Sequence, residues 1–330
     1  MSGALVSVLI VTYEHAGEID ACVDGALAQA GDGLAVEVVV ADNGSGDDTA
    51  ERVRARSAEG VQLLEMGSNR GFAAAVNAAF AATTGEQVLI LNPDCVMEPG
   101  CARALREHLD AHPDVALAAA LLHDPDGTPQ LHARRDAGLG GALWAFTVVG
   151  RRLDASRRGG RALAARRYED LWTDGPPREP IAVFCPAAAC VMAARVDLEP
   201  APFDERFPLF FNDGDLCARL HAAGRGVEIV PAARAAHGYG TSVKRAQTRD
   251  PARMRAEWVA SLRRYAGRHW SAPQRVALPA LLLADAVAAG LLSLAHREDP
   301  REVRGTLGGL GLPGGPPPLL TPVRRMGRRR

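Results

Sequence analysis

The 330-residue sequence lacks a charge bias. Its 38 basic and 39 acidic side chains give a formal net charge of −1, which argues against a nucleic-acid-binding protein. Two segments depart from this balance, because residues 151–167 and the terminal stretch TPVRRMGRRR are strongly basic. We interpret both as solvated loops or tails; the alternative is that they lie beside an anionic lipid headgroup or a diphosphate.

Cysteine motifs and export signals are absent as well. The six cysteines form no CxxC pair and show no spacing with histidine that is typical of a metal site, which indicates reduced thiols in a cytoplasmic protein. The N-terminal stretch MSGALVSVLIVTY has neither a charged leader nor a small-residue cleavage site after its short apolar run. We therefore predict that this stretch forms a strand.

Three common motifs are also missing. No GxGxxG follows the first apolar run and no GxxxxGK[ST] occurs, which excludes the dinucleotide fingerprint and the Walker phosphate loop. The GxSxG nucleophile elbow is absent too. The chain is 47% hydrophobic, as expected of a globular protein with a sizeable core.

What the first 120 residues contain is an alternation of strand and helix patterns. Apolar, β-branched runs predict strands at 5–13, 36–43, 61–66, 86–94 and 115–122, with helical stretches between them. Asp47 or Asp48 is placed to cap the helix at 49–58. Continuous apolar strands, each followed by a helix, predict an α/β fold with a Rossmann-like, mostly parallel sheet covered on both faces.

The pattern is weaker further along the chain. Residues 123–180 are rich in Gly, Arg and Pro and show little periodicity, whereas 181–230 predict a strand pair, the helix DLCARLHAAG and the strand GVEIVP. From about residue 250 the chain is predicted to form a helical extension that ends in a flexible Gly/Pro-rich tail.

One segment of this extension, residues 276–295, is long enough to span a bilayer. Pro279 and the central Asp285 argue against a span, because a central Asp costs about 2.5–3.5 kcal/mol on insertion scales. We predict a helix that packs on the rest of the protein or lies in the membrane interface, as a peripheral association.

Polar side chains gather where the predicted strands end, which is the ligand-binding edge of an open α/β sheet. Asp42 either accepts a pyrimidine ring N–H or starts an Asx-turn, and taken alone the turn is favoured. Asp94 either ligates Mg²⁺ or Mn²⁺ together with phosphate oxygens or caps the next helix. The strand-end residues are Thr12, Tyr13, Glu14, Asp42, Asn43, Asn92 and Asp94.

Three later stretches are further candidates. In FFNDGDLCARL, Asp213 and Asp215 start a predicted helix behind apolar residues, and an N-cap role explains one carboxylate but not both. Arg70 and Gly71 lead into a helix N-terminus that suits a phosphate, unless the stretch is a plain loop. His237 is either a packed histidine or a ligand, with Lys244 and Arg245 close by in sequence for an anionic substrate.

Six stretches, taken in order, closely resemble family-2 glycosyltransferases, in particular bacterial rhamnosyltransferase-like members. They are VSVLIVTYE, VVVADNGSGDDT, NRGFAAAVNAAF, VLILNPD, FDERFPLFFNDGDLCARL and HGYGTS. The resemblance implies a GT-A fold and a metal-dependent, inverting transfer of a sugar, rhamnose among the candidates, from a UDP- or dTDP-sugar. The acceptor would be a hydroxyl of a glycan or lipid-linked molecule in cell-envelope polysaccharide or glycoconjugate synthesis.

The resemblance also divides the chain. Residues 1–122 would form the nucleotide-sugar-binding half and 123–248 the acceptor-binding and catalytic half of one GT-A domain. Residues 249–305 would form C-terminal helices and 306–330 a basic tail.

The resemblance assigns roles to the candidate residues. Asp42 would bind uracil or thymine, with Thr12 at the same subsite. Asp94 would bind a Mg²⁺ or Mn²⁺ ion that bridges the diphosphate, and His237 would approach that metal or the diphosphate. Asp213 takes the place of the Asp in the family's Glu-Asp pair, the general base. The remaining donor-side residues are Tyr13, Glu14, Asn43, Arg70, Gly71 and Asn92, and Asn212, Asp215 and Phe211 would lie near the acceptor or support the base.

Two positions depart from the family pattern. Glu14 stands where the family usually has Asn, and Asn212 replaces the Glu of the Glu-Asp pair. Asn212 is the feature that favours an alternative, a catalytically weak module that binds a nucleotide-sugar or a glycan. A sugar-phosphate nucleotidyltransferase would require an N-terminal Gly-rich loop with Arg and Lys, and VSVLIVTYEHAGEID contains none.

Overall fold

The computed structural model describes residues 4–31, 33–136, 138–141, 147, 175–238, 250–296 and 301–318. The basic run at 151–167, Lys244 with Arg245, and the terminal arginines lie outside the described residues.

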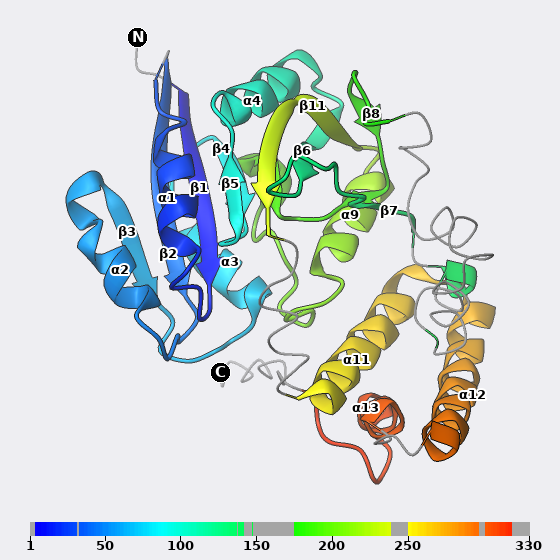
Figure 1. Cartoon of the computed structure of the whole chain (residues 1–330). Helices are drawn as coiled ribbons and strands as arrows, with labels where there is room; N and C mark the ends of the chain where they lie inside the picture. Colours follow the sequence, from blue (N-terminus) through cyan, green and yellow to red (C-terminus); the bar gives the residue numbers. More distant parts are fainter. Residues whose placement is uncertain are drawn as a thin grey trace, which may run out of the picture.

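A large sheet forms the centre of the molecule (Figure 1), in the order β3-β2-β1-β4-β10-β6-β11-β5 with β8 beside β11. A second, two-stranded sheet pairs β7 with β9. The strands of the large sheet are β1 (Ala4–Thr12), β2 (Leu34–Asp42), β3 (Val61–Glu65), β4 (Gln87–Leu91), β5 (Cys95–Met97), β6 (Val115–His123), β8 (Ile181–Ala182), β10 (Cys190–Ala194) and β11 (Gly226–His237). Those of the small sheet are β7 (Ala133–Arg134) and β9 (Cys185–Pro186).

The large sheet is mixed. β1 to β4 pair in parallel, as do β6 and β11, which confirms the α/β class predicted from the apolar runs. β10 is antiparallel to both β4 and β6 and lies between them, and β5 and β8 are antiparallel to β11. The predicted strand pair at 181–195 is therefore three short strands in different places. Sequence order hides this arrangement, because β10 returns from the second half of the chain.

Helices cover both faces of the sheet, as predicted. α1 (Ile19–Leu27) and α4 (Cys101–Ala111) bury side chains such as Val23 and Leu105 in the core on one face. α3 (Phe72–Ala81) and α9 (Asn212–Ala222) bury Val76 and Leu216 in the core on the other. α2 (Thr49–Ala55) packs beside β3 at the edge. The strand ends that carry the candidate residues are thus held between two apolar layers.

Three C-terminal helices pack together below the sheet (Figure 1): α11 (Pro251–His269), α12 (Ala272–His296) and α13 (Arg301–Leu310). Their shared core includes Val259, Tyr265 and Leu282 together with Phe207 from the segment before α9. α13 crosses α11 closely, because a Cβ at Gly309 would lie 2.5 Å from Val259 Cβ. The helical extension predicted from the sequence is therefore tied to the segment before α9 by its own core.

A buried ion pair joins α11 to α12. Arg255 Nη2 lies 2.7 Å from Asp285 Oδ2, and both side chains are almost fully buried. Arg255 Nε also donates to Thr306 Oγ1 of α13 at 3.3 Å. The Asp that interrupts the apolar run 276–295 therefore points into the protein, where a cation compensates its charge.

Replacing Asp285 by Ala tests this pair. The change leaves a buried guanidinium without its carboxylate, so we expect the free energy of unfolding to fall by about 3–5 kcal/mol. The matched control is Asp110→Ala, which removes an exposed i,i+4 pair with Arg106 and should cost no more than about 1 kcal/mol. Urea unfolding followed by tryptophan fluorescence reports both, and equal losses for the two variants would contradict the assignment.

Candidate active site

The loop after β1 carries three of the predicted donor residues. Thr12 has no exposed surface, and its hydroxyl lies 3.4 Å from His15 Nδ1, which also accepts the Tyr13 N–H. The Thr12 side chain therefore supports the loop from behind, whereas Tyr13 is exposed, and the contact of Thr12 with a nucleotide stays a prediction. Glu14 adopts a φ of +58° and donates its N–H to Ser45 Oγ. Asn adopts this left-handed conformation more readily than Glu. The Glu that stands here in place of the family's usual Asn therefore has a strained backbone conformation.

Asp42 ends β2 and organises the turn that follows. Its carboxylate accepts the N–H groups of Gly44 at 3.1 Å and Ser45 at 3.0 Å, together with the Ser45 hydroxyl. This is the Asx-turn interpretation of the sequence. A carboxylate offers about four acceptor sites, so these bonds leave capacity for one more donor. Reading of a pyrimidine base by Asp42 stays a prediction.

The turn after β2 is joined to the loop before α3 by one close packing contact and by hydrogen bonds, and we call this connection the clasp. Gly44 has a φ of +79°, and a Cβ there would lie 2.8 Å from Ser68 Cα. Asn43 Oδ1 accepts the Arg70 N–H at 2.8 Å, and Asn43 Nδ2 donates to Asn69 Oδ1 at 3.2 Å. The side chain amide of Asn43 is thus used to hold the loop, and the exposed Arg70 is presented beside the N-terminus of α3.

Gly71 connects the same loop to the segment that leads into α9. Its φ is +92°, and a Cβ would lie 2.8 Å from the Pro208 carbonyl oxygen. Gly71 N–H donates to Asn69 Oδ1 at 3.1 Å, and Ala73 N–H donates to the Pro208 carbonyl at 3.3 Å. Only glycine fits here, so the predicted donor loop and the helix of the predicted base are packed together.

Asp94 and His237 face each other beyond the ends of β4 and β11. Both side chains are buried, and His237 Nε2 lies 3.5 Å from Asp94 Oδ1. Gln130 orients the His237 ring. Its Nε2 donates to Asp124 Oδ1 at 2.6 Å and to the His237 carbonyl at 2.8 Å. Gln130 Oε1 is therefore the acceptor for His237 Nδ1–H at 3.0 Å, which leaves Nε2 as the ring nitrogen that faces Asp94.

This arrangement suits a divalent cation. An imidazole nitrogen and a carboxylate oxygen that face each other in a buried place can both ligate a divalent cation. Among the residues that the structure describes, no group of three or more His, Cys, Asp or Glu gathers to form a metal site. Two protein ligands fit a cation whose other ligands are water and substrate phosphates. Asn92 lies near Asp94 at the end of β4, where its N–H donates to the Ala189 carbonyl at 2.8 Å.

Asp213 lies in the first turn of α9 and forms an ion pair with Arg134 of β7. Its other oxygen accepts the Gly214 N–H at 2.8 Å. Asn212, the unusual residue before it, donates from Nδ2 to the Leu209 carbonyl at 3.1 Å and accepts the Asp213 N–H at 2.7 Å. An amide can make the first of these bonds and a glutamate cannot, so Asn212 braces the turn that carries Asp213.

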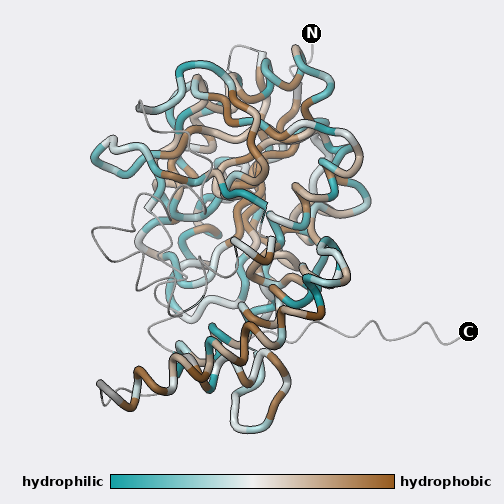
Figure 2. The backbone as a smooth tube through the Cα atoms, turned by 90° about the vertical axis from the view of Figure 1, so that its right-hand side faces the viewer, coloured by the Kyte–Doolittle hydropathy of each residue, from teal (hydrophilic) through white to brown (hydrophobic). Residues whose placement is uncertain are grey.

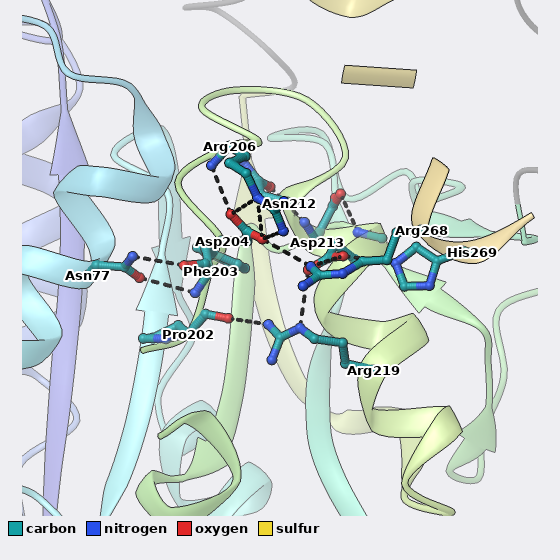
Figure 3. Close-up of polar contacts among 12 residues, drawn as sticks. Asn77, Pro202, Phe203, Asp204, Arg206, Asn212, Asp213, Arg219, Arg268 and His269 are labelled. Atoms are coloured by element: carbon teal, nitrogen blue, oxygen red, sulfur yellow. Dashed lines mark hydrogen bonds and ion pairs between the residues drawn. The ribbon is translucent and has the colours of Figure 1, made fainter. Parts of the chain in front are cut away.

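Asp215 lies one half-turn further along α9 and has no exposed side-chain surface. His269 Nε2 and Arg268 Nη1 both lie 2.8 Å from its Oδ1, and Arg219 Nε lies 3.1 Å from its Oδ2. Figure 3 shows Arg219, Arg268 and His269 converging on the start of α9. Arg268 also pairs with Asp204 at 3.0 Å. Asp215 thereby ties α9 to α11.

Phe211 packs on the C-terminal helices. Its ring centroid lies 5.7 Å from that of Trp258 and 5.3 Å from that of Tyr265, both on α11. Its φ is +66°, a conformation that a bulky residue adopts only when packing holds it there. Burial and then Asp136, which accepts the Tyr265 hydroxyl at 3.0 Å, raise the pKa of Tyr265. In this structure the Phe211 ring contacts protein side chains on α11.

A single short segment, residues 130–134, contacts both groups of candidate residues. Gln130 orients His237, and Arg134 pairs with Asp213. Their Cα atoms are at most about 14 Å apart, because an extended chain advances no more than about 3.6 Å per residue. Sequence reasoning missed both residues, since 123–180 shows no periodicity, and the run HARRD was the only local signal.

His132 lies within this segment and is buried between the two groups. Its Nε2 accepts the Leu122 N–H at 3.4 Å. Burial, and then the nearby His237 and Arg134, lower the pKa of His132 to about 3. The ring therefore stays neutral in the folded protein at neutral and mildly acidic pH.

Comparison with known proteins agrees with the resemblance. A family model described as Glycosyl transferase family 2 matches residues 7–167. The N-acetylglucosaminyl-diphospho-decaprenol L-rhamnosyltransferase of Mycobacterium tuberculosis is 30% identical over 265 residues, a match that covers 73% of this chain and 78% of the relative.

Solved structures are similar in fold. The mannosyltransferase PcManGT from Pyrobaculum calidifontis, in complex with GDP-Man and Mn²⁺, has a TM-score of 0.53 at 20% identity, covering 90% of this chain and 76% of that one. GalNAc-T7 with UDP, GalNAc and Mn²⁺ has a TM-score of 0.53 at 14% identity, and the match covers 79% of this chain but spans only 47% of GalNAc-T7. These likenesses confirm the GT-A fold.

The clasp at Gly44 yields a test with a built-in control. Gly44→Ala introduces both a left-handed alanine and a contact with Ser68 backbone, whereas Gly67→Ala introduces only a left-handed alanine (φ +72°) in open space. We expect Gly67→Ala to lower the free energy of unfolding by about 1–2 kcal/mol and Gly44→Ala by clearly more. Thermal unfolding of the two variants measures this difference. Equal melting temperatures would show that the turn after β2 does not pack against the loop before α3.

The buried His132 predicts an acid sensitivity. Between about pH 6.5 and about pH 3 the unfolded chain binds a proton at this residue that the folded chain does not, so the stability falls as the pH is lowered. The slope from this group reaches at most about 1.4 kcal/mol per pH unit. His132→Gln keeps an acceptor for Leu122 and should flatten the decline in urea-unfolding measurements between pH 7 and pH 5; an unchanged slope would refute this role.

Proposed function

This chain belongs to glycosyltransferase family 2, and on that premise we propose that it transfers a sugar, with inversion at the anomeric carbon, from a UDP- or dTDP-sugar to a hydroxyl of a lipid-linked or glycan acceptor. The observation that supports the proposal is the segment 130–134, in which Gln130 bonds His237 of the Asp94–His237 pair and Arg134, four residues on, pairs with the Asp213 carboxylate. A place for a divalent cation and a carboxylate that acts as a base are the two groups that the proposed displacement would use.

The roles follow from the chemistry of that displacement. Asp94 and His237 would hold Mg²⁺ or Mn²⁺, which supplies positive charge to the leaving diphosphate. Arg70, exposed beside the N-terminus of α3, would add a cation on the donor side. Asp42 would receive a uracil or thymine N–H at its remaining acceptor site, with Tyr13 and Glu14 on the neighbouring loop after β1.

Asp213 would take the proton of the acceptor hydroxyl. Such a base needs to lie within hydrogen-bond reach of the hydroxyl as it attacks, and alignment behind the anomeric carbon supplies much of the rate. Arg134 and the Gly214 N–H hold the two carboxylate oxygens, so the carboxylate is oriented before substrate binds. The remaining lone pairs of Asp213 are available to an incoming hydroxyl.

Rhamnose is the first sugar to test, because the relative from Mycobacterium tuberculosis is named as an L-rhamnosyltransferase of a diphospho-decaprenol acceptor. We place the reaction in the cytoplasm and infer a role in cell-envelope polysaccharide or glycoconjugate synthesis. The six cysteines are all buried and reduced, as this compartment allows.

Two substitutions separate the proposed roles. Asp213→Asn removes the base, so we expect turnover to fall by about 10²–10⁴-fold while Mn²⁺-dependent binding of the donor is kept. Asp94→Asn removes a metal ligand, so both donor binding and turnover should fall. Asp110→Asn, at an exposed pair, is the control that should change neither.

The measurements are a screen of UDP- and dTDP-sugars for released nucleotide diphosphate, and calorimetric titration of the donor with and without Mn²⁺. Near-normal turnover by Asp213→Asn would remove Asp213 as the base. Donor binding that survives both Asp94→Asn and chelation would remove the metal site.

A further inference from the structure

The outward face of α12 is apolar along its whole length. Val276, Leu283, Val287, Leu291 and Leu294 are between 41% and 79% exposed. They recur at intervals of three, four or seven residues, so they form one stripe on the helix. These are five of the nine large hydrophobic side chains that are exposed among the described residues, and no other element carries such a set. Figure 2 shows hydrophobic residues along this projecting helix.

The opposite face of α12 is the one that packs on the protein. Leu278 and Leu282 are buried in the core shared with α11, and Asp285 points inward to Arg255. Asp285 is the only charged residue between Val276 and Leu294. This is the reverse of a surface helix of a soluble protein, which keeps its charges toward water.

α12 is long and apolar enough to cross a bilayer by length and composition, but its contacts oppose a span. A spanning α12 would have to leave α11 and separate the buried Arg255–Asp285 pair, exposing an Asp near the middle of the hydrocarbon layer. With the pair kept intact, α12 can bury its outer stripe only by lying along a surface.

The distribution of charge along the chain indicates which kind of surface α12 would lie on. Residues 250–330 contain 14 basic and 6 acidic side chains, whereas residues 1–249 contain 24 and 33. The cationic surplus lies in the C-terminal part of the sequence that also carries the apolar stripe, and five of its arginines belong to the tail outside the described residues. Among the described residues, Arg275 is exposed where α12 begins and Arg304 is exposed on α13. A second copy of this chain would bring like charges together, while an anionic bilayer complements them.

We propose that α12 docks on an anionic lipid bilayer, parallel to its surface, with the stripe Val276–Leu294 buried at the boundary between headgroups and acyl chains. Such helices insert their apolar face by about 5–10 Å. Docking involves the catalytic half directly, because α11 packs against α12 and holds the start of α9 through Asp215. If the proposed glycosyl transfer is correct, this geometry selects a lipid-linked acceptor over a soluble glycan.

Vesicle sedimentation tests the docking without any assay of transfer. The full chain is mixed with vesicles of equimolar phosphatidylglycerol and phosphatidylcholine, or of phosphatidylcholine alone. We expect binding to the anionic vesicles that weakens as salt is raised. Leu291→Glu should lower the partition coefficient by about tenfold or more. Val196→Glu, at an equally exposed apolar residue of α8 (Arg195–Leu198), should leave it unchanged.

Three results would overturn the proposal. Equal loss of binding in Leu291→Glu and Val196→Glu would show that the stripe is not the contact. Protein that stays in the membrane after an alkaline carbonate wash would show a span. A dimer in light scattering that Leu291→Glu dissociates, with no vesicle binding by the parent protein, would assign the stripe to a second copy.

Transfer assays read the acceptor separately. Leu291→Glu should keep its rate on a short, water-soluble acceptor and lose about tenfold or more on the same acceptor in vesicles. Vesicle binding without transfer to either acceptor would leave the docking in place and contradict the proposed function instead.

Discussion

The arrangement of this protein depends on the ion pairs that the buried Asp215 carboxylate forms. A fully buried charge is tolerated only when cations and hydrogen bonds compensate it, and here Arg219, Arg268 and His269 do so. Two of these partners lie at the end of α11, outside the α/β half. The compensation of one charge therefore attaches the C-terminal helices to the first turn of α9, two residues from Asp213.

The same principle of compensated polar groups organises the rest of the site. Gln130 Oε1 accepts the hydrogen bond of His237 Nδ1–H, which leaves Nε2 facing Asp94, and Arg134 pairs with Asp213. The side-chain amides of Asn212 and Asn43 form hydrogen bonds with backbone groups of the loops that carry the candidate residues. A site assembled in this way is set before substrate arrives, which reduces the reorganisation needed during reaction.

Much of the α/β half could be predicted from local pattern. Buried parallel strands are continuous apolar runs, so β1, β2, β4 and β6 were found close to their observed bounds. The short antiparallel strands were not, because two-residue strands such as β8 and β9 have no periodicity to detect. Among the candidate residues, Asp42, Asp94 and Asp213 stand at strand or helix ends, where the sequence already made them candidates, whereas Arg134 and Gln130 lie in a stretch without pattern. Thr12 was recognised at the correct strand end but is buried behind it.

The sequence by itself determined the family, the α/β class and the carboxylates at the strand ends, because those depend on short runs of residues and their spacing. Only the tertiary structure decided which groups meet: Arg134 with Asp213 across 79 positions, and Arg255 with Asp285. It also decided which face of α12 packs on the protein and which face stays exposed. A helix that is apolar on nearly every side gives no sign of which side will be covered, until a buried ion pair turns its one carboxylate inward.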